Sequence, residues 1–315
     1  GNNLTITNAT VFNGTGIKVK LLTTVRRTTA EHKVKTRVPA HIVLANNVAT
    51  GTPASYGADA KHKEVSLGKG DVYKLHAVLE SDSASVDPKL PQFSVTGISG
   101  TFVKGETIVG ATSGTQALLI NTTSPFTYLI TNSKTFTSGE TVTGQTSGAT
   151  ASLSGSETAG SKDITNRFTL DTGQRDNFYD IARLVRKGGA TAPTGRIIAI
   201  CDYFSHGAGD FFNVDSYGGI DYKEILTYSA TRVDPEVREP TGEYDLRDSV
   251  DFRPRVADCT INTATSIQSQ TAHKITSYCF DFNNRSFSGT GASVCTKCPA
   301  NHYRTKNNST CLHCP

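Results

Sequence analysis

The sequence has no methionine and no tryptophan, and its longest apolar runs are only a few residues long, as from Ile197 to Ile200. A membrane-spanning helix needs roughly 20 consecutive apolar residues, so we expect no membrane span. Without a methionine the chain has no initiator residue, which is expected of a stretch from a longer polypeptide. The chain also lacks a large excess of either charge, because it has 32 Lys and Arg and 28 Asp and Glu. The resulting net charge of +4 does not indicate a nucleic-acid partner.

Good helix formers are sparse, whereas residues that favour strands are abundant. The chain contains 44 Thr, and Thr with Val, Ile, Tyr and Phe suits a pleated, half-buried surface. Strand-like runs such as Tyr73 to Leu79 recur between Gly, Asn, Asp and Ser. The sequence therefore predicts a multi-domain, all-β or mostly β protein. Its best candidate for a central buried strand is the run from Arg196 to Phe204.

Composition divides the chain into four parts. Residues 1–97 form a polar β region, in which the stretch from Lys18 to Arg37 carries seven basic residues and one acid. This stretch lacks interleaved aromatics, which favours a solvated or subunit-facing strand surface over a nucleic-acid site. Residues 165–285 are richer in aromatic and charged side chains and predict a β-sandwich-like domain. Residues 286–315 predict a small cysteine-rich module.

Residues 98–155 contain an internal repeat. The segment from Phe102 to Gly114 recurs 34 residues later as Phe136 to Gly148, in the frame Phe-x-x-Gly-Glu-Thr-(Ile/Val)-x-Gly-x-Thr-Ser-Gly. Each copy predicts a small β-hairpin that cannot bury its apolar face alone and must pack on its neighbour. Two interpretations stay open, a spacer module in an elongated assembly and a duplicated hairpin within one ordinary β domain.

Three segments of the third part carry a family resemblance, namely residues 176–180, 202–217 and 244–255. Together with the repeats and the segment from Leu67 to Tyr73, they resemble large virion structural proteins of T4-like tailed phages, especially those of marine cyanobacteria. The Asp-Phe-Arg-Pro-Arg stretch at 251–255 is the most specific part. The resemblance implies a tail or baseplate component that assembles in the host cytoplasm with other virion proteins and has no enzymatic role.

Arginines and acids interleave between residues 232 and 255. This pattern suits bidentate Arg–carboxylate pairs, which fix the register of an interface, although a solvated charged loop would look the same. We expect a homo-oligomer, with a trimer or a symmetric ring as the working hypothesis. The predicted assembly surface combines charged residues with apolar anchors: Arg247, Asp248, Asp251, Phe252, Arg253, Arg255, Phe211, Phe212 and Tyr217.

Two other functions compete with assembly. One is a receptor-binding or adhesion module, like a tail fibre, that contacts the host surface. The other is a tail-associated hydrolase, suggested by His206, Asp210, Asp215 and Asp221 in a Gly-rich loop. The Asp spacing does not match a calcium loop, and no phosphate loop or Gly-x-Ser-x-Gly motif occurs. Asx turns explain these residues more simply, so we expect no enzyme.

Four cysteines near the end have the spacing Cys295-x2-Cys298-x12-Cys311-x2-Cys314. Two such Cys-x-x-Cys pairs can present four thiolates to one zinc ion. The same segment resembles the short cysteine-rich repeats of ephrin-receptor-like modules, which would imply disulfides instead. Both alternatives stay open, because assembly in a reducing cytoplasm favours zinc and later exposure outside the cell favours disulfides.

Overall fold

The computed structural model confirms the all-β prediction. It describes residues 29–47, 59–175, 178–221, 225, 227–231, 240–246, 248–256, 258, 263–268, 270–274, 302–303 and 312–313. Within these ranges the only helices are two short 3-10 turns, η1 (Thr165–Arg167) and η2 (Val214–Tyr217). No helix in this part of the chain is long and apolar enough to cross a membrane.

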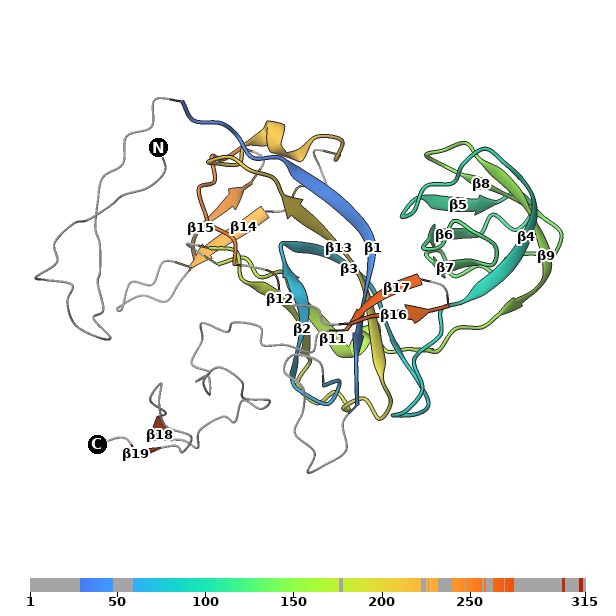
Figure 1. Cartoon of the computed structure of the whole chain (residues 1–315), viewed down its shortest axis with the longest axis horizontal. Helices are drawn as coiled ribbons and strands as arrows, with labels where there is room; N and C mark the ends of the chain where they lie inside the picture. The colour runs from blue at the N-terminus through green and yellow to red at the C-terminus, as the bar shows by residue number, and fades with distance from the viewer. Residues whose placement is uncertain are drawn as a thin grey trace, which may run out of the picture.

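A six-stranded sheet forms the middle layer of the molecule (Figure 1), with the strand order β10-β3-β13-β1-β17-β16. Its strands are β1 (Lys35–Ala45), β3 (Val72–Glu80), β10 (Lys162–Asp163), β13 (Ile197–His206), β16 (Thr263–Ile267) and β17 (Gln270–Lys274). The predicted central strand is confirmed, because β13 lies between β3 and β1 and pairs antiparallel with both.

Strand β13 is apolar on both faces. Ile197 and Ala199 join one core cluster, whereas Ile198 and Ile200 join another on the opposite side of the sheet. Side chains alternate across a strand, so an unbroken apolar run is expected only where both faces are covered.

A second sheet covers the first of these faces. It has three strands in the order β11-β12-β2, with the bounds β2 (Glu64–Gly70), β11 (Phe168–Asp171) and β12 (Ile181–Arg186). Val65, Leu67 and Leu184 from this sheet share a core with Val43 and Val78 from the middle sheet. The two sheets form a β-sandwich.

The strand pairing differs from the division that composition suggested. Strands β1, β2 and β3 lie within residues 1–97, but they pair with β12 and β13, which lie within residues 165–285. Both ranges therefore contribute to the same sandwich. Composition reports local chemistry, whereas antiparallel pairing joins segments that are more than a hundred residues apart.

A closed six-stranded barrel lies beside the sandwich (Figure 1), inserted between β3 and β10. Its strands are β4 (Gln92–Ser99), β5 (Thr107–Gly110), β6 (Gln116–Leu119), β7 (Phe126–Ile130), β8 (Thr141–Gly144) and β9 (Thr150–Thr158). Leu118 and Leu129 from the barrel share a core with Ile42 and Ile200 from the middle sheet. The barrel thus covers the second face of that sheet.

The two copies of the repeat lie in the same barrel and supply one strand each, β5 and β8. Strands β5 and β8 each begin directly after the glutamate of their copy, and they pair antiparallel, with Ile108 opposite Gly144 and Gly110 opposite Val142. The arrangement is that of a duplicated hairpin within one β unit. The pairing of β5 with β8 joins the two copies in the closed barrel.

Each glutamate of the repeat binds the Thr-Ser-Gly turn of the other copy. The Glu106 carboxylate accepts hydrogen bonds from the backbone N–H (3.0 Å) and the hydroxyl (2.9 Å) of Ser147. Glu140 accepts the same pair from Ser113, at 2.9 Å and 2.8 Å. A Cβ atom at Gly110 would lie only 2.6 Å from Glu140 Oε2. These contacts explain why Glu, Gly and Ser recur at fixed positions of the repeat.

Two further hairpins complete the described structure. Strands β14 (Thr227–Thr231) and β15 (Pro240–Asp245) pair antiparallel, as do the two-residue strands β18 (His302–Tyr303) and β19 (Leu312–His313). Apart from β18 and β19, the predicted cysteine-rich module at 286–315 lies outside the described residues.

Candidate functional site

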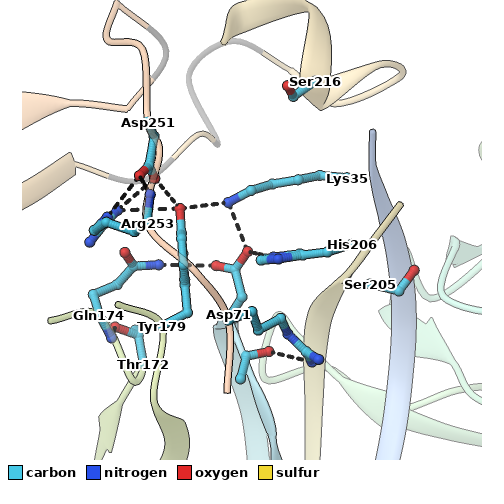
Figure 2. Close-up of polar contacts among 12 residues, drawn as sticks. Lys35, Asp71, Thr172, Gln174, Tyr179, Ser205, His206, Ser216, Asp251 and Arg253 are labelled. Carbon is cyan, nitrogen blue, oxygen red and sulfur yellow. Dashed lines mark hydrogen bonds and ion pairs between the residues drawn. The ribbon is translucent and has the colours of Figure 1, made fainter. Parts of the chain in front are cut away.

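A buried lysine lies at the end of the sandwich, where several chain segments meet (Figure 2). Lys35 begins β1 and is only 1% exposed. Asp71, between β2 and β3, and His206, the last residue of β13, lie beside it, while Tyr179 and Asp251 reach it from two loops. Lysine is almost never fully buried unless its charge is paired, so this site needs a specific set of partners.

Asp71 is the counterion of Lys35. The Lys35 Nζ atom lies 2.8 Å from Asp71 Oδ2, and His206 Nε2 lies 2.7 Å from the same oxygen. Gln174 Nε2 donates a hydrogen bond of 3.0 Å to the other oxygen, Oδ1. Three side chains from separate segments therefore hold the two oxygens of one buried carboxylate (Figure 2).

Tyr179 links this ion pair to a second one. Lys35 Nζ donates a hydrogen bond of 3.1 Å to the Tyr179 hydroxyl, and the hydroxyl donates one to Asp251 Oδ2. Arg253 holds the same carboxylate through Nε, 3.0 Å from Oδ1, and Nη2, 2.9 Å from Oδ2. This bidentate geometry fixes the orientation of Asp251. A continuous polar network thus runs from Asp71 to Arg253, and we call it the Lys35 network.

Aromatic rings surround the ammonium group of Lys35. It lies 4.6 Å from the ring centre of Tyr179, 4.7 Å from Phe212 and 4.8 Å from Tyr217. The ring of Phe204 is 5.6 Å away. Ring faces attract cations, and the rings also shield the ion pair from water.

Burial dominates the electrostatics of the site. It lowers the pKa of Lys35 below its usual value, against the opposing effect of Asp71. Burial alone would raise the pKa of Asp71, but Lys35 and His206 lower it to about 2. Burial also lowers the pKa of His206. Asp71 is therefore ionised at neutral pH, and Lys35 loses its proton more readily than an exposed lysine does.

Strand register and two short bridges bring these residues together. Lys35 lies directly opposite His206 in the pairing of β1 with β13. Phe212 bridges to Asp251, and Tyr179 bridges to Arg255. The three segments that carry the phage resemblance, around residues 176–180, 202–217 and 244–255, thus contribute side chains to one network.

Several predicted assembly residues point into this network. Phe212, Tyr217 and Asp251 are buried, and Arg253 is half-buried against Asp251. Their charges and rings are already engaged within the chain. Asp251 and Arg253 form the bidentate pair that the Arg and Asp pattern predicted, but the pair lies within one chain.

The other predicted assembly residues lie outside the network. Phe252 is 69% exposed, and its ring centre lies 5.9 Å from that of the half-buried Phe211. Asp248 is exposed, and Arg255 pairs with Asp258 rather than with Asp251. Arg247 falls outside the described residues.

Sequence reasoning missed the centre of the site. Lys35 belongs to the basic stretch from Lys18 to Arg37, for which we predicted a solvated or subunit-facing surface, and that prediction is wrong for Lys35. Asp71 was part of the resemblance but had no assigned role. Strand alternation gives two faces without saying which is buried, so no local signal distinguishes Lys35 from its exposed neighbours.

The candidate hydrolytic residues do not gather around one point. His206 binds Asp71, Asp210 Oδ2 accepts the backbone N–H of Glu31, and Asp215 accepts the side-chain amide of Asn213. In the described part of the chain, no three His, Cys, Asp or Glu side chains are placed to hold a metal ion.

The predicted zinc or disulfide ligands are not described by the structure. The residues Cys295, Cys298, Cys311 and Cys314 all lie outside the described ranges, so zinc and disulfides both remain predictions. Among the described residues, Cys201 is a free thiol buried in the sandwich core.

The chain was compared with protein families, curated proteins and solved structures. No family model, curated protein or solved structure matches it. The resemblance to phage virion proteins therefore stays a prediction from the sequence segments quoted above.

Proposed function

We propose that the chain is a structural component of a phage tail or baseplate, which works by assembling with copies of itself and with other virion proteins. The resemblance motivates the virion assignment. The barrel and the sandwich share one core cluster, which suits a rigid structural part. The segments that carry the resemblance supply much of the Lys35 network.

One observation carries the proposal, an exposed apolar face beside the Lys35 network. Phe252 is 69% exposed and contacts Phe211. Val34, Val214 and Val250, each within two residues of Lys35, Phe212 or Asp251, are exposed as well. We call these five residues the apolar face. Exposed apolar side chains gathered on neighbouring segments are typical of protein–protein contacts.

The backbone holds the apolar face in position. Phe212 and Asp251 exchange two backbone hydrogen bonds, of 2.8 Å and 2.9 Å. Successive side chains of an extended segment point to opposite sides, so burying Phe212 and Asp251 turns Phe211 and Phe252 outward. A surface fixed in this way loses little conformational freedom on binding.

A second copy of the chain is the partner that fits this face best. A two-fold contact brings the same surface of both copies together. The chain on either side of Phe252 carries both signs of charge, because Asp248 is exposed and Arg255 pairs with Asp258. Mixed charges allow two identical surfaces to meet without net repulsion.

The test is a matched pair of substitutions, Phe252→Ser on the apolar face and Val86→Ser at an exposed turn after β3. Val86 is 52% exposed and serves as the control. We expect wild type to sediment as an oligomer and Phe252→Ser to weaken self-association by about 2 kcal/mol, or roughly thirty-fold in Kd. Val86→Ser should behave as wild type.

Two results would overturn the proposal. One is a wild-type chain that stays monomeric, and the other is a Phe252→Ser variant with unchanged association. A monomeric chain that binds host cells or glycans would instead support the receptor-binding hypothesis.

A further inference from the structure

We propose that Lys35 and Asp71 react to form an intramolecular amide, an isopeptide crosslink that joins the start of β1 to the connection between β2 and β3. The proposal assigns a covalent modification site to the centre of the Lys35 network. It rests on the geometry of this site alone and does not depend on the proposed function.

The two reacting groups are already in contact. Lys35 Nζ lies 2.8 Å from Asp71 Oδ2, and each side chain is only 1% exposed. Holding two reactants together in one orientation can replace much of the entropy cost of a bimolecular reaction. The site excludes bulk water, so the reverse reaction, hydrolysis of the amide, lacks its co-reactant.

Burial also changes the balance between the ion pair and the amide. In water, an amine and a carboxylic acid ionise, and ionisation opposes condensation. In this site both ions are removed from water, and burying a charge is costly even when it is paired. The amide is neutral, so its formation removes both buried charges at once.

The neighbouring side chains match the steps of the reaction. The Tyr179 hydroxyl accepts a hydrogen bond from Lys35 Nζ and donates one to Asp251, which gives the departing proton a path to a carboxylate. Gln174 Nε2 donates a hydrogen bond to Asp71 Oδ1, where negative charge collects when Nζ attacks the carboxyl carbon. His206 Nε2 contacts Oδ2, the leaving oxygen.

The reaction balances without a further reagent. A bond forms between Lys35 Nζ and Asp71 Cγ, and the bond from Cγ to Oδ2 breaks. Of the three hydrogens on the ammonium group, one stays on the amide nitrogen and one passes directly to Oδ2 across the 2.8 Å contact. The third leaves through Tyr179 to Asp251 and returns along the same path to Oδ2, which departs as a water molecule. No oxidant, reductant or activated donor is consumed.

The primary test is the intact mass of the full chain under denaturing conditions. We expect a mass lower than the sequence mass by one water molecule, and a proteolytic fragment in which the Lys35 and Asp71 peptides are joined. A wild-type chain with the full sequence mass and no joined fragment overturns the proposal.

Variants separate the crosslink from other dehydration reactions. Lys35→Arg keeps the positive charge but lacks the amine, so we expect the full sequence mass. Asp71→Asn should lose one ammonia molecule instead of water. A water loss that persists in Lys35→Arg, as from cyclisation at another aspartate, would contradict the proposal.

Tyr179→Phe tests the role of the hydroxyl while keeping the ring beside Lys35. We expect a smaller crosslinked fraction in freshly folded protein, whereas Tyr203→Phe, outside the Lys35 network, should crosslink as wild type does. Equal crosslinking in both variants would refute the assigned proton path.

Discussion

Replacing Glu140 with Gln should destabilise the barrel, because the Glu140 carboxylate organises turns in both copies of the repeat. Its Oε2 atom accepts the backbone N–H groups of Thr112 and Ser113, each at 2.9 Å. Its Oε1 atom accepts the Thr137 N–H at 2.6 Å and the Ser113 hydroxyl at 2.8 Å. One side chain thus satisfies three backbone donors and one hydroxyl.

The expected cost follows from these contacts. Glutamine keeps one acceptor oxygen but places an NH2 group against the other two donors. A hydrogen bond to a charged group contributes about 1.5–3 kcal/mol, and an unsatisfied buried donor costs a similar amount. We therefore expect Glu140→Gln to reduce the free energy of unfolding by about 3 kcal/mol. Ordinary surface substitutions change it by less than about 0.5 kcal/mol.

The repeat supplies its own matched variant. Glu106→Gln alters the equivalent contacts in the other half of the barrel and should cost nearly the same. Asp82→Asn, at an exposed turn outside the barrel, is the control and should leave the stability unchanged. The assays are urea unfolding followed by circular dichroism and native-state amide exchange at Thr112 and Ser113. A loss below about 1 kcal/mol for Glu140→Gln, or very different losses for the two glutamates, would refute the reasoning.

Three further predictions test other parts of the structure. Gly110→Ala should reduce the free energy of unfolding by about 1–3 kcal/mol, because the new Cβ would lie 2.6 Å from a glutamate oxygen. The control Gly188→Ala meets nothing within 4 Å and should be tolerated. Equal urea midpoints for the two variants would contradict this prediction. Tyr179→Phe should cost about 1–3 kcal/mol by breaking the link between Lys35 and Asp251, and a variant with wild-type thermal stability would show that the link is unimportant. Burial lowers the pKa of His41 from 6.5 to about 3. Between these two pH values His41 is protonated in the unfolded chain but not in the folded one, so the free energy of unfolding should fall as the pH drops from 6.5 towards 3. His41→Gln should flatten the dependence of the urea midpoint on pH in this range. An unchanged dependence would show that His41 does not cause it.

Local patterns were sufficient for the elements that depend on neighbouring residues. The unbroken apolar run of β13 predicted a strand covered on both faces, and the structure confirms it. The spacing of the repeat predicted paired hairpins, and the structure has them as β5–β6 and β8–β9, which meet through β5 and β8. The exchange of Glu106 and Glu140 between the copies could not be predicted, because a single copy does not show which turn its carboxylate reaches.

The candidate site depended on contacts that the sequence does not show. Lys35 and Asp71 are brought together by the pairing of β1 with β13 and of β13 with β3, over distances along the chain at which composition and periodicity carry no information. The Asp251–Arg253 pair is local, and the Arg and Asp pattern did predict pairing of this kind. The sequence pattern alone did not show whether such a pair forms within one chain or between two chains.

The most direct test of the proposed function is the native mass of the full wild-type chain, measured by light scattering across a dilution series. The account predicts an oligomer of defined copy number that dissociates on dilution and that Phe252→Ser shifts towards the monomer. A single monomeric mass at every concentration, identical for wild type and Phe252→Ser, would contradict it.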